Sequence, residues 1–123
     1  MFALPAATDP QAALDAARAR WRGAAIADYR FHVQRSCFCP EPYRRRYVIR
    51  VRDGRPVGAP QEVRADATVP RLFRVVQAQI DGEGTVAVTY GATGLPRRVS
   101  ADPIPAAVDD EFTLRAGGLR PLP

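Results

Sequence analysis

Apolar residues near the start of the chain recur at the spacing of an amphipathic helix. The shared face consists of Leu14, Ala17 and Trp21, at positions i, i+3 and i+7. Asp9 followed by Pro10 is a typical helix start, because aspartate caps free N–H groups and proline fits the first helical position. We predict a helix over residues 10–22 that ends at Gly23 and anchors Trp21 in the core.

A second helical pattern is the clearest in the chain. Its apolar positions are Val69, Leu72, Phe73, Val76 and Ile80. Because these positions share one face, they predict an amphipathic helix packed on the core. Thr68 is expected to cap its N-terminus, and Gly82 to end it.

Apolar and polar residues alternate in the remaining segments, which is the pattern of strands with one buried face. The first two strands are predicted at residues 26–37 and 44–52, with inward side chains Tyr29, Phe31, Val33, Tyr47, Ile49 and Val51. Two more strands follow the second helix, at residues 85–90 and 95–101, where the inward residues include Val88 and Tyr90. The last strand is marked by Phe112 and Leu114.

Asp53-Gly54 after the second strand indicates a hairpin turn. We predict a three-residue loop with Gly54 in the left-handed conformation, since this loop places Val57 opposite Val51 on the buried face. Pro56 and Pro60 confine the third strand to an edge of the sheet.

The predicted order is therefore α-β-β-β-α-β-β-β, an α+β fold in which two helices pack on one face of an antiparallel sheet. The 123 residues suffice for one domain, which we place at residues 9–116, with loose termini at residues 1–8 and 117–123. No apolar run reaches the roughly 20 residues that a membrane span needs. The first seven residues are too short, and lack the charge, for a signal peptide.

Charge raises the question of an anionic partner. The net charge is +5, and all 18 basic residues are arginines, whose planar guanidinium groups bind carboxylate and phosphate. Strand parity gathers five of them into a stripe on the open side of the sheet: Arg30, Arg44, Arg46, Arg50 and Arg52. This stripe is the candidate partner-binding surface. The neighbouring aromatic rings Phe31 and Tyr47 have core parity, so a nucleic acid finds no ring to stack on.

Cys37 and Cys39 form an unusual close pair at the end of a strand. A fully extended strand holds such residues near the upper limit for a disulfide, so a bridge requires a bend. Three interpretations stay open: a disulfide, two buried thiols, or a redox or metal site. A thiol redox site usually lies at a helix N-terminus, and we predict no helix after this pair.

The sequence offers little support for a metal site or a catalytic site. Zinc needs four ligands, and His32 points away from the cysteine pair. As a catalytic base, His32 lacks an orienting carboxylate. The acids are Asp102, Asp109, Asp110 and Glu111, which lack the spacing of a calcium loop and can instead cap turns or pair with arginines. We predict no catalytic, cofactor-binding or metal-binding residue.

Several residues stand in the order of a known family. They are Trp21, Ile26, Tyr29, Phe31, Cys37, Phe38, Cys39, Val51, Asp53, Gly54, Thr68, Val69, Leu72, Phe73, Tyr90, Gly94, Pro96 and Asp102. The chain resembles an uncharacterised bacterial family of small exported or lipid-anchored domains of unknown function. The resemblance covers about residues 21–114. It implies a periplasmic or lipid-anchored location, no assigned activity, and a mature form to which Met1 was added.

Three functional hypotheses follow. The first is an exported, non-enzymatic domain that binds or braces another macromolecule through the open sheet face or the cysteine-bearing loop. The second is a nucleic-acid-binding module that uses the arginine stripe. The third is a thiol redox protein.

Overall fold

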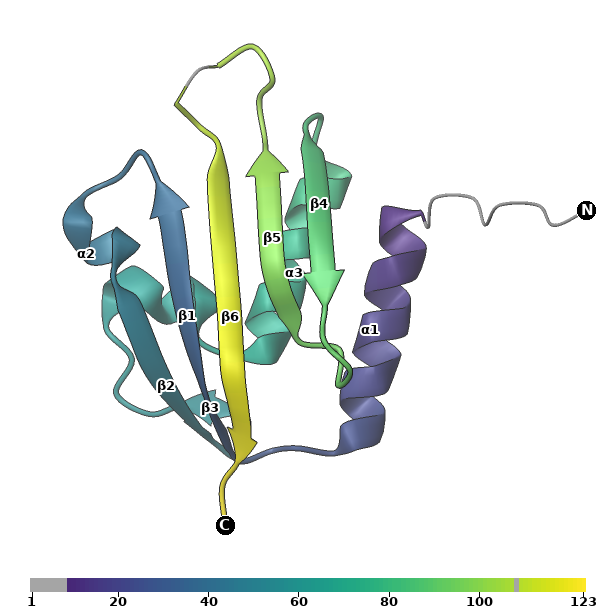
Figure 1. Cartoon of the computed structure of the whole chain (residues 1–123), viewed down its shortest axis with the longest axis vertical. Helices are drawn as coiled ribbons and strands as arrows, with labels where there is room; N and C mark the ends of the chain where they lie inside the picture. Colours follow the sequence, from purple (N-terminus) through teal and green to yellow (C-terminus); the bar gives the residue numbers. More distant parts are fainter. Residues whose placement is uncertain (1–8, 108) are drawn as a thin grey trace, which may run out of the picture.

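A computed structural model describes residues 9–107 and 109–123 of the chain (Figure 1). The elements in chain order are α1 (Pro10–Ala24), β1 (Tyr29–Cys37), α2 (Glu41–Arg44), β2 (Arg46–Arg52), β3 (Arg55–Pro56), the 3-10 helix η1 (Gln61–Asp66), α3 (Val69–Asp81), β4 (Thr85–Tyr90), β5 (Pro96–Asp102) and β6 (Phe112–Pro121). This is the predicted order with two short helices, α2 and η1, inserted. No helix among these residues is both long and apolar enough to cross a membrane.

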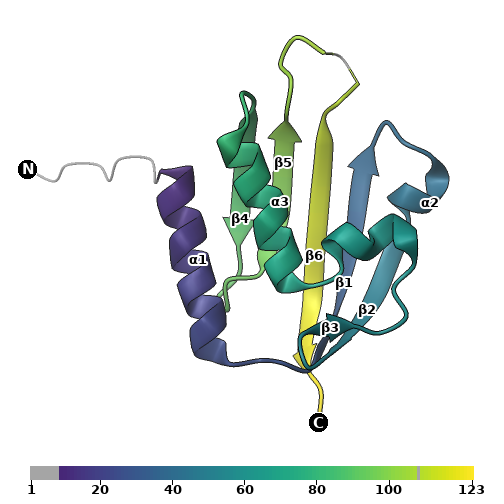
Figure 2. The ribbon, with the colours of Figure 1, turned by 180° about the vertical axis from the view of Figure 1, so that it is seen from behind.

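The six strands form one antiparallel sheet in the order β3-β2-β1-β6-β5-β4. The last strand of the chain therefore lies in the middle of the sheet, between β1 and β5. Figure 2 shows α3, α1 and η1 on one side of the strands, and Figure 1 shows the opposite side uncovered. The predicted α+β class, with helices packed on one face of an antiparallel sheet, is confirmed.

The core lies between the sheet and the helices. The buried residues include Leu14, Ala17, Trp21, Tyr29, Phe31, Val33, Ile49, Val51, Leu72, Phe73 and Val76, as the two periodicities predict. Val88 and Tyr90 are half-buried rather than buried, because β4 is an edge strand. The ring of Trp21 meets Tyr29 edge to face, with 5.2 Å between centroids. The Tyr29 hydroxyl accepts a hydrogen bond from the Val69 backbone N–H at 2.9 Å, which ties β1 to the start of α3.

The helix starts agree with the sequence, but one end does not. The side chains of Asp9 and Thr68 accept hydrogen bonds from backbone N–H groups in the first turns of α1 and α3. Gly82 ends α3 as predicted. The prediction that Gly23 ends α1 is wrong, because the helix continues to Ala24 and Ala25 takes the left-handed conformation that closes it.

The prediction of a three-residue loop between β2 and β3 is wrong. The loop has two residues, Asp53 and Gly54, both with positive φ, and Arg52 pairs directly with Arg55. This is the turn that best matches the twist of the flanking strands. Val57 consequently donates its N–H to the Arg50 carbonyl and is 56% exposed. The strand itself is at the sheet edge, as its prolines predict.

The tail from residue 117 is part of β6 rather than loose. Tyr29 pairs with Pro121 and Arg30 with Arg120, so β6 follows β1 to its start. The register shifts once between residues 30 and 32, near Gly118, whose φ is positive. Two adjacent glycines look like a strand end in the sequence, but here they form an irregularity inside a strand. The prediction for residues 1–8 lies outside the described residues.

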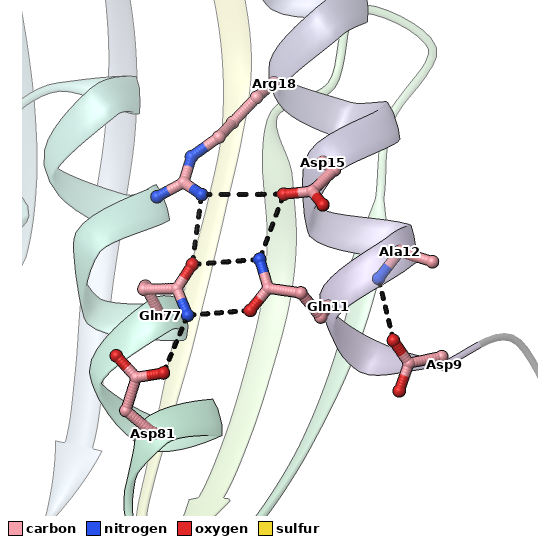
Figure 3. Close-up of polar contacts among 7 residues, drawn as sticks. All are labelled: Asp9, Gln11, Ala12, Asp15, Arg18, Gln77 and Asp81. Atoms are coloured by element: carbon pink, nitrogen blue, oxygen red, sulfur yellow. Dashed lines mark hydrogen bonds and ion pairs between the residues drawn. The ribbon is translucent and has the colours of Figure 1, made fainter.

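A polar network joins α1 to α3 (Figure 3). The side-chain amides of Gln11 and Gln77 bond to each other twice, at 3.0 and 2.8 Å. Arg18 donates to the side-chain oxygen Oε1 of Gln77 at 3.1 Å, and the side-chain nitrogen Nε2 of Gln77 donates to Asp81 at 3.0 Å. Gln77 is thus the residue whose side-chain hydrogen bonds connect α1 to α3 at the polar edge of their contact.

Replacing Gln77 tests this network. We expect Gln77→Leu to lower the free energy of unfolding by about 1–2 kcal/mol, because each net hydrogen bond contributes about 0.5–1.5 kcal/mol. The measurement is urea unfolding, with Gln79→Leu on the same helix, outside this network, as the matched control. Equal losses in the two variants would show that the network does not hold the helices together.

Candidate functional site

The open face of the sheet is rich in arginine. Residues paired across neighbouring strands share a face, so the register extends the assignment from strand to strand. Eight arginines lie on the open face: Arg30, Arg46, Arg50, Arg52, Arg55, Arg98, Arg115 and Arg120. All are exposed except Arg52, which is half-buried.

Cross-strand neighbours arrange six of these arginines in two rows. The Arg30 row consists of Arg50, Arg30 and Arg120, on β2, β1 and β6. The Arg115 row consists of Arg98, Arg115 and Arg46, with Gln34 between the last two. Because Gln34 follows Arg30 by four positions along β1, the two rows lie about 13 Å apart along the strands.

Little negative charge balances these rows. Among the strand residues that the structure describes, Asp102 at the end of β5 is the sole acid. In the same described part of the chain, an ion pair reaches the open face only at Arg52, whose Nη1 lies 3.8 Å from Asp28. Like charges directly opposite each other, such as Arg30 and Arg50, destabilise a sheet. An anion bound between them would relieve this repulsion.

His32 lies between the rows, opposite Val48 and Gly117. A Cβ atom added to Gly117 would lie 3.1 Å from the His32 ring, so the imidazole occupies the space that a side chain there would fill. Partial burial, and secondly repulsion from Arg46, lower the pKa of His32 below its usual value. The ring is therefore neutral at neutral pH, and the centre of the face is uncharged between two charged rows.

The arginine stripe predicted from the sequence needs one correction and several additions. Arg44 does not share the strand parity, because it ends α2, and its Nε donates to the Cys39 carbonyl at 3.0 Å. Arg30, Arg46, Arg50 and Arg52 lie on the open face as predicted. The arginines of β3, β5 and β6 were missed because no local pattern shows which strands are neighbours. Phe31 and Tyr47 point to the helix side, as predicted.

The cysteine pair lies where β1 ends, and the structure joins Cys37 and Cys39 in a disulfide. Their Cα atoms are 5.3 Å apart, closer than full extension allows, so the chain bends here. The prediction that no helix follows is wrong, since α2 begins two residues after Cys39. Phe38, between the cysteines, is 80% exposed.

A groove of about 400 Å³ beside the disulfide contains a partly buried ion pair. Arg35, on the helix side of β1, places its Nη2 3.1 Å from Oδ1 of Asp66, whose side chain is 6% exposed. The Arg35 guanidinium also stacks 4.4 Å above the Phe112 ring. This pair could not be predicted from the local pattern, because Arg35 stands where the strand alternation calls for an apolar residue. Its contacts explain a buried charge without a ligand.

One acidic residue near this groove, Asp110, holds the loop before β6. Asp110 accepts a hydrogen bond from the Ile104 N–H at 2.6 Å, which is one of the turn-capping roles expected from the sequence. Within residues 9–107 and 109–123, no group of three or more His, Cys, Asp or Glu residues is placed to hold a metal ion.

One family model matches the chain. It covers residues 13–121 and is described as a family of unknown function, DUF6174. The match confirms the resemblance to an uncharacterised domain family that the sequence suggested. No curated protein and no solved structure matches the chain.

Proposed function

The chain belongs to the DUF6174 family of unknown function, and we propose that it is a small exported domain, without catalytic activity, that binds a polyanion on the open face of its sheet. The observation that carries this proposal is the pair of arginine rows with almost no acid beside them. A polymer that carries phosphate or sulfate groups at intervals along its chain can contact both rows at once.

A folded protein partner fits this face less well. Interfaces between proteins have a core depleted of charge and enriched in aromatic residues. The open face instead offers charge over several strands, and its large exposed apolar side chains are Val48 and, at the β3 edge, Val57, at 63% and 56% exposure. Binding to such a face depends on charge and on the release of counterions, as it does for phosphate polymers.

The disulfide supports export. Disulfides persist in oxidising compartments such as the periplasm and are reduced in the cytosol. The pairing of Cys37 with Cys39 is thus consistent with a domain that works outside the cytoplasm.

A nucleic-acid-binding module is the second candidate, and His32 is the observation in its favour. Single-stranded nucleic acid binds through charge together with bases stacked on rings, each worth about 1–3 kcal/mol. The described part of the open face places one ring between the rows, so it offers a stacking site for a single base. One such site adds little to the charge contacts, so we expect single-stranded DNA, whose charges lie further apart than those of polyphosphate, to bind more weakly than polyphosphate does.

Reversing one arginine in each row tests the proposal. The probe is a fluorescein-labelled polyphosphate chain long enough to cross both rows, followed by fluorescence anisotropy over a range of salt. We expect the double variant Arg50→Glu, Arg115→Glu to lose about tenfold or more in affinity. Its slope of log affinity against log salt should fall by at least about 1.4, because each lost phosphate contact on a single-stranded chain removes about 0.7. Each new glutamate also neutralises an arginine opposite it.

The matched control is the double variant Arg64→Glu, Arg74→Glu, which changes the net charge equally on η1 and α3. These two arginines are exposed, so we expect both double variants to fold normally. Equal loss in the two variants would mean that net charge, not the open face, drives binding, and the proposal would fail. Tighter binding of single-stranded DNA than of polyphosphate would place the nucleic-acid module first.

A further inference from the structure

We propose that the Cys37–Cys39 disulfide is exchangeable and passes its oxidising equivalents to the dithiol of a partner protein. This activity is separate from the polyanion binding proposed above and does not depend on it.

Part of the surface of both cysteines is open to solvent. Both cysteines are half-buried, and they line two separate hollows. The first hollow, of about 500 Å³, is formed by Cys37, Phe38, Cys39, Pro40 and Arg44. The second is the groove that contains the Arg35–Asp66 pair. A disulfide that only braces a core has no need of such access. The exposed Phe38 ring beside the first hollow gives an approaching chain an apolar contact.

The turn around the bridge is held by other bonds. The Arg44 side chain donates to the Cys39 carbonyl at 3.0 Å, and the Tyr47 hydroxyl donates to the Pro42 carbonyl at 2.6 Å. Gln34 on β1 donates to the Arg44 carbonyl at 3.0 Å. The disulfide closes a very short loop. In the chain-entropy model, this closure stabilises the folded state about half as much as closure of a loop of about 15 residues does. The fold therefore survives when the bridge opens.

The charge near the bridge favours reaction from the first hollow. Arg44 is the charged residue that lines it, and a nearby guanidinium stabilises a departing thiolate. The second hollow is lined by more acids than bases: Arg35 is its arginine, and its acids are Glu62, Asp66, Asp109, Asp110 and Glu111, whose charge opposes a thiolate there. The partner's thiolate thus enters from the Arg44 side.

The exchange proceeds in two balanced steps. In the first, a partner thiolate attacks one sulfur of the bridge, the bond between Cys37 and Cys39 breaks, and the other cysteine leaves as a thiolate that takes up a proton. The first step leaves a mixed disulfide between the remaining cysteine and the partner. In the second step, the other thiolate of the partner attacks the partner's own sulfur in this mixed disulfide. The second cysteine then leaves and is protonated. The partner is oxidised to a disulfide, and the cysteine pair is reduced by two electrons.

The test uses the full oxidised chain and a synthetic dithiol peptide in excess. Alkylation and mass spectrometry follow the thiols of both molecules over time. We expect one disulfide to pass from each chain to the peptide, and the thermal unfolding midpoint of the reduced chain to fall by no more than about 6 °C. A bridge that stays closed while the peptide stays reduced, or a chain that unfolds on reduction, would overturn the proposal.

Variants at Arg44 test the role of its charge. We expect Arg44→Gln to slow the transfer about threefold, which corresponds to a rise of about one pKa unit in the leaving thiol. Arg44→Lys keeps the charge and should retain the wild-type rate. The control is Arg45→Gln, because Arg45 pairs with Glu41 and does not line the first hollow. Equal rates for Arg44→Gln and Arg45→Gln would remove Arg44 from the mechanism and contradict the direction of attack.

Discussion

We expect Phe73→Ala to lower the free energy of unfolding by about 3–5 kcal/mol, from the lost burial of the ring and the cavity that remains. Phe73 is 3% exposed and lies on the face of α3 that packs against the sheet. Total stabilities of small domains are about 5–15 kcal/mol, so this loss is large. Urea unfolding followed by circular dichroism measures it.

The matched control for this variant is Phe38→Ala. It removes the same ring from a position that is 80% exposed, and we expect a change within about 0.5 kcal/mol. A small loss in Phe73→Ala, similar to that in Phe38→Ala, would contradict the packing of α3 on the sheet.

Gly94→Ala is the second substitution with a large expected effect. The φ of Gly94 is +95°, which residues with a side chain rarely adopt. An added Cβ would clash with the carbonyl oxygen of Ala17 and lie 3.0 Å from its carbonyl carbon, so α1 would have to move. Backbone strain of this kind costs about 1–3 kcal/mol, and displacement of α1 adds to it. We expect a total loss of at least about 2 kcal/mol, measured by urea unfolding.

Gly23→Ala provides the opposite expectation with the same chemical change. Gly23 lies inside α1, and nothing stands within 4 Å of an added Cβ. An alanine there should stabilise the protein by up to about 0.5 kcal/mol, because glycine weakens a helix and Gly23 lies in the last turn of α1. If both variants had the same effect, the close approach of the loop at Gly94 to α1 would be wrong.

The helices and most of the strands could be predicted because their signal is local. In α3, the apolar spacing, the cap Thr68 and the final Gly82 all agree, and the helix has these bounds. The β2–β3 loop was predicted wrongly because the argument assumed that Val57 is buried, whereas the turn geometry of Asp53-Gly54 prevails and exposes it. The four residues of α2 are too few to give a period.

The binding face could be predicted only in part, because it depends on which strands are neighbours. Arg30 and Arg50 were assigned to one face from parity along adjacent strands. Arg115 and Arg120 join them because β6 pairs with β1, a contact between distant parts of the chain. Beyond Gly117, β6 runs beside the His32 ring, which lies close to both glycines, and nothing in the local pattern indicates this cross-strand contact.

The central claim is that a polyanion binds the open face. Nuclear magnetic resonance titration of the nitrogen-15-labelled chain with polyphosphate tests it most directly, because each backbone amide reports its own position. We expect the shifted amides to cluster at Arg30, His32, Arg50 and Arg115, while those of α1 and α3 stay unchanged. Shifts concentrated on the helices, or no shifts at saturating polyphosphate, would contradict the account.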